Sequence, residues 1–116
     1  MEGKFEFGVP IIEISLTNRK LKVMLDTGFN GDLMLPENII SELKLEPIGI
    51  TDYITASGDT YTTHIYKAKI ELFGEENEIT VLSTPMAISL AGMQLFHLCK
   101  ITLERHKDRI QIEKTG

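Results

Sequence analysis

VMLDTGFNGDLMLP, residues 23–36, places a polar loop between two short apolar runs. Asp26 directly follows the first run, so a carboxylate stands where a buried strand is expected to end. A buried charge costs several kcal/mol unless it is paired or hydrogen-bonded. The backbone N–H of Gly28 can supply one hydrogen bond, and the hydroxyl of Thr27 can lock the loop. The residues alone leave two interpretations open: Asp26 caps a turn through its side chain, or it is a functional carboxylate.

Length, composition and charge limit the classes of protein that this chain can be. The 116 residues predict a single domain, 1–116, with 42% hydrophobic and 25% charged residues, as in an ordinary globular protein. A net charge of −5 without a basic run argues against binding to nucleic acid. The longest mostly apolar stretch, 85–99, is too short to cross a bilayer, so no membrane association is expected. A single cysteine, Cys99, and the lack of an apolar leader sequence predict a cytoplasmic protein.

Most of the chain alternates between apolar and polar residues with a period of two, which predicts β-strands. One segment, 36–45, has Pro36 in its first turn and apolar residues on one face, and it predicts a helix. A second, short helix is expected over 93–98. Strands at this spacing favour a mainly β fold, either a small closed barrel or a sandwich. The expected strands cover residues 4–9, 11–17, 20–27, 49–56, 60–72, 78–84, 86–91, 100–105 and 109–113.

Three pieces of sequence occur in an order that is typical of one family. They are LDTGFNGDLMLP (25–36), TASGDTYT (55–62) and ISLAGMQLFHLCKITLE (88–104). With them the chain resembles the retropepsin-like aspartic proteases, especially their small prokaryotic single-domain members. The resemblance covers roughly residues 11–113. It implies a small closed barrel of the acid-protease type with one clear helix, a short C-terminal helix and a flap hairpin.

The resemblance also implies a catalytic site formed by Asp26, Thr27 and Gly28. Each chain of the family supplies one aspartate, and a twofold homodimer completes the site. This sequence holds one Asp-Thr-Gly and is too short for two lobes, which is consistent with half a site. The implied activity is that of an aspartic endopeptidase acting on a peptide or protein substrate, with no cofactor and no metal ion. In that family Thr27 would join the two loops across the dyad, and Gly28 would let the substrate approach.

The hairpin 53–62 stands where the family carries its flap. Gly58 is expected to let the tip bend, and backbone groups near it are expected to bind an extended substrate. The substrate-binding residues predicted in the hairpin are Ile54, Thr55, Ala56, Ser57 and Gly58. Ile54, together with Phe29, Met86 and Ile88, is also a candidate for a pocket wall, although each of the four fits an ordinary core position equally well.

Two other functions remain open from the sequence. Met93 and Gln94 follow Gly92, where the viral enzymes carry an arginine that ties the dimer together and an Asn or Asp. A chain without that ion pair would also suit a non-catalytic dimeric module that binds peptides on the same fold. The other alternative is a monomeric β-domain in which Asp26 is only structural.

Overall fold

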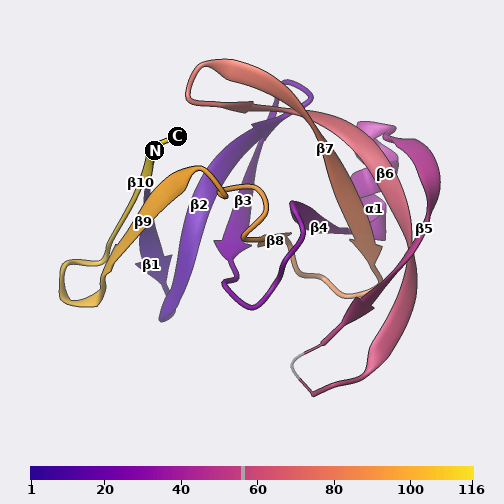
Figure 1. Ribbon diagram of the computed structural model, residues 1–116, viewed down its shortest axis with the longest axis horizontal. Helices are drawn as coiled ribbons and strands as arrows, with labels where there is room; N and C mark the ends of the chain where they lie inside the picture. The colour runs from indigo at the N-terminus through magenta and orange to yellow at the C-terminus, as the bar shows by residue number, and fades with distance from the viewer. Residues whose placement is uncertain (56) are drawn as a thin grey trace.

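A computed structural model of the chain describes residues 1–55 and 57–116 (Figure 1). Ten strands, one α-helix and one short 3₁₀ helix account for most of these residues. In chain order they are β1 (Glu2–Glu6), β2 (Val9–Leu16), β3 (Arg19–Leu25), β4 (Leu33–Pro36), α1 (Glu37–Leu43), β5 (Glu46–Ile54), β6 (Thr60–Leu72), β7 (Glu75–Thr84), β8 (Leu90–Ala91), β9 (Cys99–Glu104), η1 (Arg105–Lys107) and β10 (Arg109–Lys114). The expected mainly β class is confirmed.

The strands form one sheet in the order β5-β6-β7-β4-β8-β3-β2-β1-β10-β9. A further pairing of β2 with β6, at Ser15 with Glu71 and Leu16 with Ile70, joins two distant parts of this order. The pairings from β2 through β3, β8, β4 and β7 to β6 therefore close into a ring. Strand β5 extends the sheet on one side of the ring, and β1, β10 and β9 extend it on the other (Figure 1).

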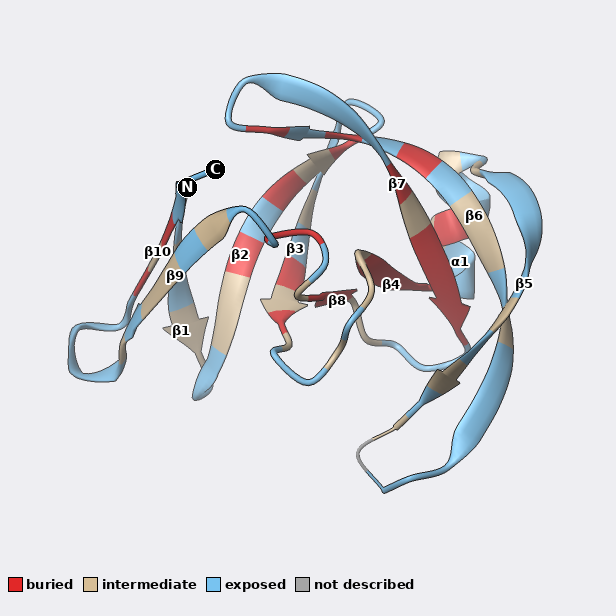
Figure 2. Ribbon diagram, in the orientation of Figure 1, coloured by how far each residue is buried: buried red, intermediate tan, exposed pale blue. Residues whose placement is uncertain are grey.

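The interior of the ring is apolar, as the alternation in the sequence predicts. In β2, Ile12, Ile14 and Leu16 are buried, while Glu13 between them is exposed. All four residues of β4 are buried (Figure 2). Leu33 and Leu35 belong to the main core on one face of the strand, and Met34 belongs to a second apolar cluster on the other face. A strand that is covered on both faces has an unbroken apolar sequence, which explains the run Leu33–Leu35.

Helix α1 confirms the helix expected over 36–45. It begins after Pro36 and ends at Lys44, whose backbone is left-handed with φ of 54°. Ile40 is buried in the core, and Ile39 and Leu43 pack against it from the same face. Since a short isolated helix is marginal in water, this apolar face holds α1 in place.

The segment 93–98 is not the short helix that the sequence predicts, but a series of turns. Its backbone hydrogen bonds span three residues, from the N–H of Phe96 to the carbonyl of Met93 at 3.2 Å and from Cys99 to Phe96 at 3.0 Å. The first amides of the segment donate instead to the loop that carries Asp26. The strand expected over 86–91 is likewise shorter, because only Leu90 and Ala91 pair with neighbouring strands.

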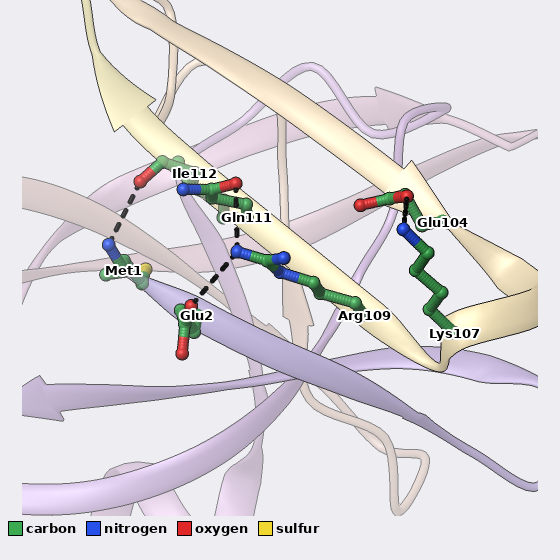
Figure 3. Close-up of polar contacts among 7 residues, drawn as sticks. All are labelled: Met1, Glu2, Glu104, Lys107, Arg109, Gln111 and Ile112. Carbon is green, nitrogen blue, oxygen red and sulfur yellow. Dashed lines mark hydrogen bonds and ion pairs between the residues drawn. The ribbon is translucent and has the colours of Figure 1, made fainter.

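The N-terminus is part of the sheet (Figure 3). The amino group of Met1 donates to the carbonyl of Ile112 at 3.0 Å, and the N–H of Ile112 donates back to Met1 at 2.8 Å. Arg109 of β10 lies 3.6 Å from the carboxylate of Glu2 in β1. These contacts join the first strand to the last hairpin. No helix among residues 1–55 and 57–116 has the length and hydropathy needed to cross a membrane.

Candidate active site

Asp26 lies at the end of β3, at the start of the loop 26–32 that leads to β4. Its N–H donates to the carbonyl of Ala91 at 2.9 Å and so continues the pairing of β3 with β8. The half-buried carboxylate accepts the N–H of Gly28 through Oδ1 at 2.8 Å. The predicted hydrogen bond from Gly28 is therefore present. Among the described residues no donor contacts the second carboxylate oxygen, which remains available for a proton, a water molecule or another carboxylate.

Backbone hydrogen bonds connect the segment around Gly92 to this loop. The N–H of Gly92 donates to the carbonyl of Asp32 at 2.9 Å, that of Met93 to Phe29 at 2.8 Å, and that of Gln94 to Gly31 at 3.2 Å. Close contact with backbone leaves no room for a side chain at Gly92, whereas a side chain at Gly31 would have to displace the Phe29 ring. A Cβ on Gly92 would lie 2.7 Å from the carbonyl oxygen of Phe29, and one on Gly31 would lie 2.5 Å from the Phe29 ring.

Asp32 adds a side-chain contact that sequence reasoning missed. Its carboxylate accepts the backbone N–H of Thr80, in β7, at 3.1 Å. Burial raises the pKa of the Asp32 carboxyl, while the bond from Thr80 and the nearby His97 act in the opposite direction. Asp32 stands directly before the buried run that begins at Leu33. The sequence therefore shows a carboxylate beside an apolar run at Asp32, but its donor, Thr80, lies 48 residues further along the chain and is not part of any local pattern.

The hairpin of β5 and β6 has the turn that was expected near Gly58. The N–H of Thr55 donates to the carbonyl of Asp59 at 2.9 Å, and that of Gly58 donates to Thr55 at 3.0 Å. Gly58 has a φ of +88°, a conformation that favours glycine. Ser57 donates through its hydroxyl to the carboxylate of Asp59 at 3.0 Å. Ala56, also predicted to bind substrate, lies outside the described residues.

The two faces of this hairpin differ. Ile54 is 72% exposed, whereas the neighbouring Tyr53 is half-buried and packs against a small apolar cluster. Because successive side chains of a strand point to opposite faces, Ile54 points away from that cluster. Tyr53 also stacks on Tyr61 across the hairpin, with ring centroids 5.7 Å apart. Sequence reasoning chose Ile54 and missed Tyr53. The signal was available, because side chains alternate between the two faces of a strand and Tyr53 is the direct neighbour of Ile54.

Two of the four candidate wall residues, Phe29 and Ile88, come together beside the loop. The apolar cluster has Met34, Leu82 and Leu90 as its buried centre, with partly buried residues around it. Phe29 and Ile88 belong to this outer group, as does Tyr53 of the hairpin. Met86 does not belong to it and is 66% exposed. The loop of Asp26 and the hairpin therefore share one apolar surface, to which Phe29 and Tyr53 both contribute.

Comparison with known proteins places this geometry in a structural class. No family model matches the sequence, and no curated protein matches it. Among solved structures, a retropepsin-like aspartic protease from Rickettsia conorii aligns with a TM-score of 0.69 at 25% identity, over 95% of this chain and 86% of that one. EIAV protease, complexed with the inhibitor HBY-793, aligns with a TM-score of 0.66 at 19% identity, over 77% and 86% of the two chains.

A third structure, the solution structure of simian foamy virus (mac) protease, aligns with a TM-score of 0.53 at 23% identity. That alignment covers 72% of this chain and 87% of the viral one. This chain therefore has the fold of the retropepsin-like aspartic proteases, and its structural neighbours are proteases.

Proposed function

We propose that the chain is an aspartic endopeptidase that acts as a twofold homodimer, with one Asp26 from each subunit in a shared site. The observation that carries this proposal is the hydrogen bond of 2.8 Å from the Gly28 N–H to Asp26, in a loop held from behind by Gly92. One carboxylate oxygen is fixed by this bond. The other has no donor among the described residues and is free to face the carboxylate of a second copy.

A pair of carboxylates can catalyse the hydrolysis of a peptide bond. Two carboxylates about 3 Å apart cannot both be ionised, so the pair shares one proton. The ionised member takes a proton from a water molecule held between them, and the protonated member donates to the oxygen of the scissile carbonyl. The water oxygen then forms a bond to the carbonyl carbon and gives a tetrahedral diol. The C–N bond of this diol breaks as its nitrogen takes a proton from the carboxyl pair, which releases the amine and leaves a carboxylic acid. The titration belongs to the pair and not to either copy of Asp26.

The hairpin of β5 and β6 is proposed as the flap over the bound peptide. Its polar tip, at Ser57 and Gly58, is proposed to offer backbone groups to an extended chain, as in the addition of a strand to a sheet. Phe29 and Tyr53, which share the apolar cluster beside the loop, are proposed to contact apolar side chains of the substrate. Ile88 lies in the same group, whereas the exposed Ile54 and Met86 would have to be covered by substrate or by the second subunit.

Replacing Asp26 tests the proposal. We expect Asp26→Asn to lower cleavage of a denatured protein substrate by at least about a hundredfold, because the amide cannot act as acid or base. The variant should fold normally, since the amide oxygen still accepts the Gly28 N–H. Asp108→Asn is the matched control and should retain full activity, because Asp108 is exposed and pairs with Arg105 in the turn between β9 and β10.

Equal cleavage by Asp26→Asn and the wild type would contradict the proposed mechanism. An Asp26→Asn chain that fails to fold would support the alternative in which Asp26 only caps a turn. A folded, dimeric wild-type chain that binds peptides without cleaving them would support a non-catalytic binding module.

A further inference from the structure

A cavity of about 410 Å³ lies behind the loop of Asp26. It is formed by the turn between β6 and β7, the segment 94–99 and the end of β10, which lie next to the chain termini in Figure 1. None of the described residues that line it comes from 26–29 or from the hairpin 53–62. Cavities of this size accommodate small organic molecules. Its apolar lining includes Ile70, Leu72, Phe73, Ile79, Leu95 and Leu98.

One carboxylate in this cavity differs from the others. Glu75 pairs with Lys114 at 3.1 Å, and Glu78 pairs with Lys67 at 3.3 Å. Asp32 also lines the cavity and is half-buried, but no lysine or arginine among the described residues lies within ion-pair distance of it. Within residues 1–55 and 57–116, its carboxylate accepts one hydrogen bond, from the Thr80 N–H. A carboxylate has about four acceptor positions, so most of the capacity of Asp32 is unused.

We propose that this cavity binds a small organic cation with an apolar body, whose charged group bonds to the carboxylate of Asp32. An amidinium or guanidinium group suits the site best, because its planar pair of N–H donors matches the two oxygens of a carboxylate. A partly desolvated carboxylate gains more from such a bond than an exposed one. The aliphatic walls would contact the apolar body of the ligand.

A ligand in this cavity would touch the loop of Asp26 from behind. The backbone carbonyl of Asp32 accepts the N–H of Gly92, and Gln94 and Leu95 of the following segment line the cavity. The site is therefore separate from the proposed peptide groove but shares a loop with it. Binding at the cavity does not depend on whether the chain is a peptidase.

Benzamidine and benzamide are the matched probes for this proposal. They have nearly the same shape, but only benzamidine is a cation near neutral pH. In a titration of ¹⁵N-labelled wild-type protein followed by NMR, we expect benzamidine to bind at least tenfold more tightly than benzamide. The amide signals that move should be those of Asp32, Thr80 and residues 94–99. Equal binding of the two probes, or shifts confined to the loop 26–29 and the hairpin 53–62, would overturn the proposal.

A pair of variants separates Asp32 from the other carboxylates. Asp32→Asn keeps an oxygen that can accept the Thr80 N–H but loses the charge, so it should weaken benzamidine binding about tenfold. Glu78→Gln should leave the affinity unchanged within twofold, because Glu78 is already paired with Lys67. Unchanged binding by Asp32→Asn, or an equal loss in both variants, would show that Asp32 does not hold the cation.

The pH dependence of binding to the wild type gives a test without any substitution. Burial raises the pKa of the Asp32 carboxyl above its ordinary value of 3.8. Benzamidine affinity should therefore fall as the pH is lowered through this raised pKa, because protonation removes the charge. The other titratable groups that face the cavity are Glu75, Glu78, His97, Cys99 and Lys114. An affinity that rises as the solution is acidified would contradict binding at an ionised Asp32.

Discussion

Gly92 determines how closely the loop of Asp26 approaches the segment that follows β8. Three backbone hydrogen bonds of 2.8–3.2 Å connect the loop to this segment, and a Cβ on Gly92 would meet the backbone of the loop. The loop is therefore fixed by backbone hydrogen bonds, while one carboxylate oxygen of Asp26 accepts the Gly28 N–H. The sequence predicted the Asp26–Gly28 contact from spacing of two residues. Turn formation is the one reason for Gly31 that the sequence offers, because the contact of Gly31 with the ring of Phe29 is visible only in the structure.

A single added methyl group tests this close approach. We expect Gly92→Ala to lower the free energy of unfolding by about 3 kcal/mol, at the upper end for overpacked sites, because Cβ would meet backbone atoms that cannot move aside. Urea denaturation measures the change. Gly74→Ala is the control, since Gly74 has a φ of +76° but open space around it, and it should cost about 1 kcal/mol. Equal costs for the two variants would show that the Gly92 contact is not tight.

The two long hairpins, of β5 with β6 and of β6 with β7, are alike in backbone but differ in their place in the molecule. Each turn contains a glycine with positive φ, Gly58 in the first and Gly74 in the second, and a Cβ added to either glycine would meet no atom within 4 Å. In the first hairpin Tyr53, close to the turn, contacts the apolar cluster beside Asp26. In the second hairpin Leu82 contacts the cluster from the end of β7 that lies opposite the turn at Gly74. A strained turn should therefore affect cleavage only in the first.

Valine at each of these glycines tests whether the first hairpin is a flap. Gly58→Val and Gly74→Val should lower stability by similar amounts, because valine is strained at positive φ in both turns. Only Gly58→Val should also lower the turnover of a peptide substrate, about tenfold, since its tip must adapt over the substrate. Steady-state kinetics at a temperature where both variants are folded measures the difference. Equal turnover in the two variants would contradict a flap role for the hairpin.

Period-two alternation predicted most strands of this molecule, but it did not assign their faces or their ends. It located the hairpin at Ser57 and Gly58, yet the candidate chosen from it, Ile54, points away from the cluster that Tyr53 contacts. The helix expected over 93–98 fails for a different reason. The amides of Met93 and Gln94 donate to Phe29 and Gly31, contacts with a loop some 60 residues earlier in the chain that no local pattern contains.

The whole molecule depends on pairings between distant parts of the chain. The contact of β2 with β6 closes the ring, and the bond from Thr80 to Asp32 joins β7 to the loop of Asp26. The sequence predicted the order and class of the elements because each local pattern is clear. It did not predict the hydrogen bond to the Asp32 carboxylate, because the donor, the N–H of Thr80, lies 48 residues away in the chain. The retropepsin-like fold with a single Asp26 loop per chain is what supports the proposed dimer.

Mixing the wild type with an inactive chain tests the central proposal, that one site requires an Asp26 from each of two subunits. A fixed amount of wild type is refolded together with increasing amounts of Asp26→Asn, and peptide cleavage is measured per wild-type chain. Random pairing at a ninefold excess of the variant leaves about one tenth of the wild-type chains with a wild-type partner, so activity should fall to about that fraction. An equal excess of an unrelated protein should have no such effect. Cleavage per wild-type chain that stays constant at every ratio would contradict a shared site.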